Sequence, residues 1–182
     1  MEDVLKLFED INKLKHTERE GWKDIGVERP RDTIASHSFG ASMIGWIMAE
    51  KEGKDAEKVI KTLIIHDLIM SYIEDYTPED EEYSSKREME NKAADKLLSD
   101  VPEIIREEFE ELFKEFQEEE TEFAKFCREC DKTETLLQAY IYSKQIGENH
   151  LQEFIESYED TFETETGKET LENLRKKSSE ME

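Results

Sequence analysis

The sequence predicts an all-α fold, and three observations support that prediction. The chain of 182 residues has only 7 Gly and 3 Pro, so few positions can interrupt long helices. Its apolar residues recur at the three- and four-residue spacing of amphipathic helices along most of the chain. A hydrophobic content of 36% over this length is enough for one core, so we expect one compact domain.

The first part of the chain predicts three helices and a loop. An amphipathic helix ends near Lys15, and residues 16–34, which hold Gly and Pro without a sustained period, predict an ordered loop. A helix over about residues 36–53 follows. The next helix begins at Asp55, a typical N-cap residue, and its apolar residues lie nearly all round it. We expect this helix to continue to Asp75 and to lie at the centre of the bundle.

The second part of the chain predicts further helices. They cover about residues 85–98, 102–116, 123–145 and 151–158. We expect residues 1–160 to form the helical bundle. Residues 161–182 are rich in Glu, Thr, Lys and Ser, and we expect them to form an acidic C-terminal extension that is partly helical or frayed.

The charge of the chain restricts its partners. With 25 Lys and Arg against 48 Asp and Glu, the net charge is −23, which repels a nucleic-acid polymer. No stretch approaches the roughly 20 apolar residues that span a bilayer, and the N-terminus lacks the pattern of a secretory signal. We therefore expect a cytoplasmic protein without a membrane partner. Cys127 and Cys130 form a lone C-x-x-C pair, which indicates reduced thiols near the core more strongly than a structural zinc site.

One histidine stands out because of its surroundings. The chain has 4 His, and His66 precedes Asp67 within the most apolar predicted helix. Burying such an ionisable pair is costly unless something such as a metal ion compensates. His37 and Asp131 are candidates for further ligands, and two imidazoles with two carboxylates suit a divalent Mn, Fe, Co, Ni, Zn or Mg ion. In the alternative interpretation, His66 is a hydrogen-bonded core histidine and Asp131 is a surface acid.

The order of these four residues resembles the H…HD…D pattern of HD-domain metal-dependent phosphohydrolases. Residues 32–38 (DTIASHS) and 75–80 (DYTPED) are similar to segments of the branch of that family that includes 5′-deoxynucleotidases. Residues 125–140 are similar to the helix that carries the aspartate ligand of the branch. The resemblance implies an HD-domain helical bundle with a central divalent metal ion. The implied ligands are His37, His66, Asp67 and Asp131.

The resemblance also implies a homodimer and a reaction, the hydrolysis of (deoxy)nucleoside 5′-monophosphates to nucleoside and phosphate. Arg19 and Trp22 match an R-x-G-W segment, in which the arginine binds the phosphate and the tryptophan lies against the sugar or base. Alternatively, Arg19 is an exposed loop residue and Trp22 fastens the loop to the core. Asp67 and Asp75 are implied catalytic residues, and Asp75 is also implied near the sugar.

The sequence departs from the family at Met70. Most members have glutamate at this position, four residues after the histidine of the HD pair, where it can act in proton transfer. Methionine cannot move protons, but Glu74 lies one helical turn further on and is a candidate substitute. The alternative function is a catalytically impaired module that binds metal and nucleotide. A third interpretation is a helical scaffold without a ligand.

Overall fold

The computed structural model describes residues 2–73 and 86–181. Within these residues the chain forms helices joined by short connections and no strand, which confirms the all-α prediction. The helices are α1 (Glu2–Leu14), α2 (Gly21–Asp24), α3 (Ile34–Glu52), α4 (Ala56–Ile65), the 3₁₀ helix η1 (Leu68–Ser71), α5 (Lys86–Asp100), α6 (Glu103–Glu118), α7 (Glu122–Ile146), α8 (Leu151–Tyr158), the 3₁₀ helix η3 (Glu159–Thr161) and α9 (Glu165–Ser179).

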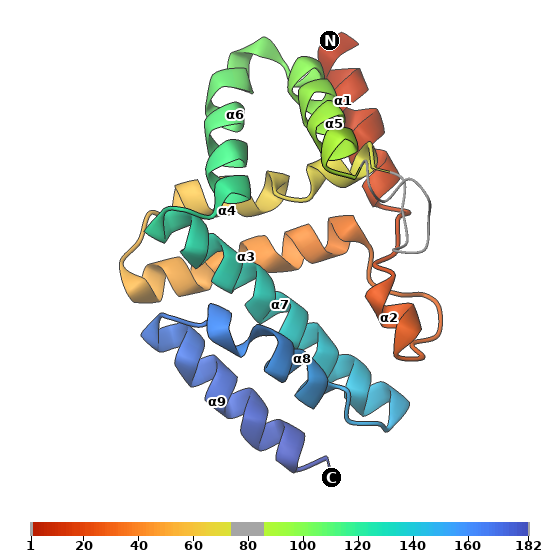
Figure 1. The fold of residues 1–182 in the computed structure, drawn as a ribbon, viewed down its shortest axis with the longest axis vertical. Helices are drawn as coiled ribbons and strands as arrows, with labels where there is room; N and C mark the ends of the chain where they lie inside the picture. Colours follow the sequence, from red (N-terminus) through yellow and green to blue (C-terminus); the bar gives the residue numbers. More distant parts are fainter. Residues whose placement is uncertain (1, 74–85, 182) are drawn as a thin grey trace.

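Helices α3 and α7 pack against each other near the middle of the molecule (Figure 1). Helix α4 runs along α3, and α1, α5 and α6 lie beyond it, whereas α8 and α9 cover the other side of α7 (Figure 1). None of the described helices combines the length and the apolar character that crossing a membrane requires. The arrangement buries the facing sides of α3 and α7, which carry candidate site residues.

Buried apolar side chains lie on both sides of α7. Toward α3 and α4 the cluster includes Met48, Leu63 and Phe126, and toward α8 and α9 it includes Leu136 and Leu151. Burial of such side chains is the main favourable contribution to folding. Helix α7 therefore joins these two clusters, and a third cluster, which includes Leu14, Leu97 and Phe109, lies among α1, α5 and α6.

Helix α3 begins with a capping box that fixes its first turn. Thr33 Oγ1 accepts a hydrogen bond from the Ser36 backbone N–H at 3.2 Å, and Ser36 Oγ accepts one from the Thr33 backbone N–H at 2.8 Å. The helix starts at Ile34, two residues before the predicted start. Gly53 ends it in the left-handed conformation, with φ 65°, at the predicted C-terminal end of the helix.

The helix that was predicted from Asp55 to Asp75 is shorter than expected. Asp55 caps α4 by accepting a hydrogen bond from the Lys58 N–H at 3.0 Å, but α4 ends at Ile65 and His66 is its C-cap. His66 and Asp67 therefore lie at the end of α4 and not within it. Neighbouring residues of an α-helix point about 100° apart. The changed backbone at Asp67, with φ −101° and ψ 7°, instead brings its carboxylate beside the His66 ring.

Residues 165–179 form α9, which packs on α7 and α8. Its Leu171 and Leu174 are buried in the same cluster as Leu136 of α7. The sequence left open whether this segment is helical or frayed, because the few apolar residues in it are widely spaced. The segment is helical, and the burial of Leu171 and Leu174 against α7 stabilises it there.

The N-terminus of α9 lies against a buried carboxylate of α7. Glu129 is 1% exposed and accepts hydrogen bonds from the backbone N–H groups of Glu163 at 2.9 Å and Thr164 at 3.1 Å. A carboxylate at this end satisfies unpaired N–H groups and is favoured by the helix dipole. A Cβ at Gly167 would collide with the Glu129 carboxylate, so glycine is needed for this close approach.

The Asp100 carboxylate, at the end of α5, joins three elements. It accepts hydrogen bonds from Lys6 of α1, from the Tyr72 hydroxyl after η1 at 3.0 Å and from Lys96 of α5 at 2.8 Å. Burial raises the pKa of Asp100, but these donors outweigh burial and hold the pKa below its usual value. The Tyr72 hydroxyl also contacts the Asp10 carboxylate of α1 and shares its one proton between the two carboxylates, so the segment that follows Asp67 is fixed to both α1 and α5.

We expect Glu129→Ala to lower the free energy of unfolding by about 2–4 kcal/mol, because two backbone N–H groups lose their buried acceptor. Urea unfolding at neutral pH measures this loss. Glu129→Gln keeps an acceptor and should lose less stability. Glu122→Gln changes an exposed glutamate on the same helix and should shift the stability by no more than about 0.5 kcal/mol. Equal stability of Glu129→Ala and the wild type would contradict the anchoring role.

The lowered pKa of Asp100 predicts a pH-dependent contribution to stability. A carboxyl whose pKa is lower in the folded state stabilises the fold above its unfolded pKa of about 3.9 and loses this contribution as the pH falls through the folded pKa. We therefore expect Asp100→Asn to destabilise the protein near neutral pH by roughly 1–3 kcal/mol. The difference from the wild type should shrink below about pH 4. Paired urea titrations over this range test it, and a difference independent of pH would be inconsistent with it.

Candidate metal centre

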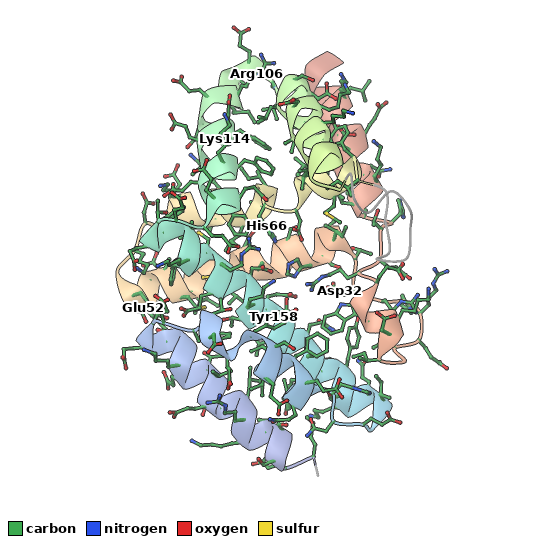
Figure 2. All side chains as sticks on the ribbon, viewed as in Figure 1. Asp32, Glu52, His66, Arg106, Lys114 and Tyr158 are labelled. Atoms are coloured by element: carbon green, nitrogen blue, oxygen red, sulfur yellow. The ribbon has the colours of Figure 1, made fainter. Side chains whose placement is uncertain are left out.

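Three elements bring the four predicted ligands together. His37 lies in the first turn of α3, His66 and Asp67 follow α4, and Asp131 lies within α7. His37 Nε2 is 3.0 Å from Asp131 Oδ1, and His66 Nε2 is 3.3 Å from Asp67 Oδ2. Ligand atoms of His37, His66 and Asp67 all lie within 4.8 Å of one another, and Asp131 Oδ1 borders them at 3.9 Å from His66 Nε2. Figure 2 shows His66 near the middle of the molecule, where these elements meet.

Each of the two imidazoles has one buried nitrogen without a hydrogen bond. His37 and His66 are 0% and 1% exposed, and the Nε2 atom of neither ring has a hydrogen-bond partner. Asp131 Oδ1 is close to His37 Nε2 but lies outside hydrogen-bonding geometry. Buried polar atoms without partners are rare because they cost free energy. A metal ion bound between the rings satisfies both nitrogens, so the residues present fit a divalent ion.

The other nitrogen of each ring has partners. His66 Nδ1 donates to the backbone carbonyl of Leu63 at 2.7 Å. His37 Nδ1 contacts Oε2 of Glu134 and lies 3.1 Å from Nη1 of Arg19. Partners of this kind orient histidines that bind metals. Both rings therefore turn their Nε2 atoms toward the same point.

At this centre, pairing with opposite charges shifts the pKa values more than burial does. Burial lowers the pKa of His37, but the carboxylates of Asp131 and Glu134 raise the pKa to about 9. Burial also lowers the pKa of His66, and the Asp67 carboxylate raises it above its usual value. Burial raises the pKa of Asp67, but the His66 ring lowers it to about 2. The carboxylates thus favour positive charge on both imidazoles, and a divalent cation would supply positive charge at the same place with the imidazoles as neutral ligands.

Two cations lie on the far side of the Asp131 carboxylate. Its Oδ2 atom is 3.1 Å from Lys132 Nζ and 3.6 Å from Arg128 Nη1. Burial raises the pKa of Asp131, but the neighbouring imidazoles and Lys132 hold it well below its usual range. Asp131 is therefore ionised and has Oδ1 directed toward the histidines.

Arg19 lies on the Nδ1 side of His37. Its guanidinium donates to Thr135 Oγ1 at 3.2 Å and lies 3.6 Å from Glu134 and 3.7 Å from Asp32. Asp32, His37 and Glu134 form a second cluster with ligand atoms within 4.8 Å, and the Arg19 guanidinium supplies the positive charge there. Figure 2 shows Asp32 near the start of α3. The arginine predicted to bind phosphate thus lies next to a predicted metal ligand.

Trp22 is buried in the core, with 2% of its surface exposed. Its ring stacks on Phe154 of α8 and meets Tyr142 of α7 edge-on, each with ring centroids 5.1 Å apart. The Arg19 guanidinium lies 5.5 Å from the centre of the Trp22 ring. These contacts agree with the interpretation in which Trp22 fastens the loop to the core, and its contact with a sugar or base stays a prediction.

The structure places Met70, which stands where most family members have glutamate, but not the two candidate groups for proton transfer. Met70 lies in η1, where its backbone N–H donates to the Asp67 carbonyl at 3.0 Å, and its side chain packs against a buried apolar cluster that includes Leu68. Glu74 and Asp75 lie outside the described residues. The position of the family glutamate, four residues after His66, therefore holds an apolar side chain.

Glu134 and Asp32 belong to the site although neither is among the residues predicted from the sequence. Both residues lie in segments that carry the family resemblance, and both lie within 4 Å of Arg19. Glu134 follows Asp131 by three residues on α7, a spacing that places both side chains on one face of a helix. That spacing is the signal that could have identified Glu134. The contact between Asp32 and Arg19 depends on the path of the loop, which has no periodic signal.

Comparisons with known proteins identify the family of this chain. The 5′-deoxynucleotidase HDDC2 of Dictyostelium discoideum is 32% identical over 153 residues, which are 80% of each chain. The 5′-deoxynucleotidase hdd1 of Schizosaccharomyces pombe is 28% identical over 159 residues, which are 83% of this chain and 78% of the relative. A conserved hypothetical protein from Pyrococcus furiosus has a similar solved structure, with a TM-score of 0.74 and 32% identity, over 94% of this chain and 99% of its own. The model of the HD domain family matches residues 11–174, across the predicted division at residue 160. With its all-helical fold and its central pair of histidines, this chain belongs to the HD domain family.

Proposed function

We propose that this protein is a metal-dependent phosphohydrolase that converts (deoxy)nucleoside 5′-monophosphates to nucleoside and phosphate. The observation that carries the proposal is the pair of buried Nε2 atoms of His37 and His66 that have no hydrogen-bond partner and lie beside two carboxylates. Such a donor set is typical of a divalent metal ion. The proposed ligands are His37, His66, Asp67 and Asp131. The relatives named 5′-deoxynucleotidase support the substrate class.

The residues around the centre have distinct proposed roles. A divalent ion bound there supplies charge neutralisation and lowers the pKa of a bound water. The Asp67 side chain is 33% exposed, so it can accept a hydrogen bond from a water that attacks phosphorus. Arg19 offers a planar pair of N–H groups to phosphate oxygens. As the new bond from the water oxygen to phosphorus forms, the bond to the 5′-oxygen breaks and that oxygen takes a proton. Glu74 and Asp75 are the proposed groups for this proton transfer and for contact with the sugar.

Trp22 supports this arrangement from the core. Because its ring is held between Tyr142 and Phe154, it fixes the loop that carries Arg19 against α7 and α8. A fixed loop keeps the guanidinium beside His37 before any substrate arrives, which lowers the ordering cost of binding. Its proposed role is therefore to position Arg19.

A second candidate function is a module that binds metal and nucleotide but hydrolyses slowly. The position of Met70 favours it, because this side chain packs against apolar residues one short turn after Asp67 and carries no group that can move a proton. The two candidates share the metal site and differ in turnover.

The remaining expectations about partners and location stay predictions. For a homodimer, the exposed apolar residues Phe39, Met43, Trp46 and Ile47 of α3 offer an uncharged face on a chain of net charge −23. The same net charge disfavours a nucleic-acid polymer as a substrate, so a single nucleotide is proposed. A cytoplasmic location is proposed from the sequence alone.

We expect phosphate release from nucleoside 5′-monophosphates to require a bound metal ion. Treatment with EDTA should abolish release and added Mn²⁺ or Co²⁺ should restore it, with one ion per chain by elemental analysis. His66→Ala should lower kcat/KM by about 100-fold or more, as does the loss of a positioned catalytic group. His16→Ala, which changes an exposed histidine outside the centre, should behave like the wild type. Full activity of the EDTA-treated protein would rule out the proposed mechanism.

We expect Met70→Glu to change turnover by less than tenfold if the wild-type protein is a competent hydrolase. In that case another group already carries out the proton transfers, and an added carboxylate has little to contribute. A positioned acid or base is worth about 100-fold or more in rate. Single-turnover assays of the wild type and Met70→Glu measure the difference, and Met70→Gln controls for polarity without an ionisable group. A gain of that size from a nearly inactive wild type would favour the impaired binding module.

A further inference from the structure

The Nδ1 atom of His37 has two partners, of which one accepts hydrogen bonds and the other donates them. Glu134 Oε2 contacts Nδ1, and as a carboxylate oxygen it only accepts hydrogen bonds. Arg19 Nη1 lies 3.1 Å from the same atom, and as a guanidinium nitrogen it only donates. In a neutral imidazole, Nδ1 carries either a proton or a lone pair. It can therefore satisfy only one of the two partners at a time.

This choice decides what His37 presents to the metal centre. With the proton on Nδ1, Glu134 is satisfied and Nε2 keeps the lone pair that a metal ion needs. With the lone pair of Nδ1 directed at Arg19, the proton sits on Nε2, 3.0 Å from Asp131 Oδ1, and prevents metal binding there. His66 has no such choice, because the Leu63 carbonyl only accepts a hydrogen bond from its Nδ1.

We propose that Glu134 is a positioning residue that holds His37 in the form protonated on Nδ1, and that Arg19 opposes it from the same side. This proposal rests on the proposed metal site. When Arg19 moves from His37 to a phosphate group, Glu134 is left as the sole partner of Nδ1 and the metal-binding form of His37 is favoured. Phosphate and metal therefore strengthen each other's binding, since coupling between two sites is reciprocal.

A glycine in α3 makes room for the Glu134 carboxylate. A Cβ at Gly40 would lie 2.9 Å from Glu134 Oε1 and 3.1 Å from its Cγ. Glycine within a helix costs about 0.5–1 kcal/mol relative to alanine, so its presence here needs a reason. The absence of a side chain at Gly40 leaves the space that the Glu134 carboxylate needs to reach the His37 ring. Gly40→Ala is therefore a variant that displaces the carboxylate without removing it.

The first test measures the affinity for Co²⁺ by competition with a chromophoric chelator. Loss of a residue that orients a metal ligand typically costs about 10–100-fold in metal affinity. We expect this loss for Glu134→Leu, a smaller loss for Glu134→Gln, whose amide oxygen still accepts, and a loss for Gly40→Ala without reduced stability of the metal-free fold. Arg19→Leu should bind Co²⁺ several-fold more tightly. Glu122→Gln, an exposed glutamate on α7, should match the wild type.

The second test reads the imidazole protons directly, by ¹⁵N NMR of the metal-free protein at a pH above the raised pKa of His37, about 9, at which its imidazole is neutral. In the wild type, both His37 and His66 should carry the proton on Nδ1. In Glu134→Leu, only His37 should change to the form protonated on Nε2, so His66 serves as an internal reference. Lys132→Met removes a positive charge 3.1 Å from Asp131 and should leave the His37 tautomer unchanged, which separates the tautomer effect from simple electrostatics.

These outcomes separate the inference from the proposed function. If the wild type binds no Co²⁺, the metal site is wrong, yet the NMR comparison still tests whether Glu134 sets the His37 tautomer. If the wild type binds Co²⁺ but Glu134→Leu and Gly40→Ala bind it equally well, the positioning role is overturned while the metal site stands. An unchanged His37 tautomer in Glu134→Leu also overturns the role. If Glu134→Leu does not fold, Gly40→Ala and Glu134→Gln carry both tests.

Discussion

The structure depends on one constraint, the burial of three ionisable side chains, His37, His66 and Asp131, beside the half-buried Asp67 where α3, the end of α4 and α7 meet. The two imidazoles and the Asp131 carboxylate lose water at this point, and each would destabilise the fold if it stood alone. The chain compensates with charge pairs inside the cluster and with fixed partners for the two Nδ1 atoms. The proposed metal ion would complete the set, because one ion could accept the lone pairs of both Nε2 atoms.

The constraint explains several features of the fold that look unrelated. Helix α4 ends at Ile65 so that His66 and Asp67, adjacent in sequence, face one point. The segment after Asp67 is tied by Tyr72 to Asp10 and Asp100, which prevents it from fraying next to the site. Helix α7 carries Asp131 and Glu134 on the side of α3 and Glu129 on the side of α9. The C-terminal helix is thus fastened to the helix that carries the proposed aspartate ligand.

Most of the fold could be predicted from the sequence, because amphipathic spacing identifies helices locally and Gly and Pro mark their ends. The break in α4 could not, since residues 68–71 are as apolar as the helix before them and nothing in their spacing marks a change to 3₁₀ geometry. The burial of Trp22 and the docking of α9 depend on partners more than 30 residues away, Phe154 and Glu129. The four candidate ligands were proposed from spacing and burial cost, and the family resemblance joined them into one set. The spacing on α7 could also have identified Glu134.

The charge around the centre bears on how a strongly anionic protein could bind the anionic substrate proposed for it. Three cations, Arg19, Arg128 and Lys132, lie near the centre together with four carboxylates, Asp32, Asp67, Asp131 and Glu134. With neutral imidazoles, these seven described side chains have one net negative charge, and Glu119, which pairs with Arg128, adds a second. A divalent ion bound at the proposed site would offset this charge at the point where α3, the end of α4 and α7 meet. The proposed metal ion would then serve two purposes in one position, because the charge that balances the buried ligands would also reduce the repulsion of a phosphate group.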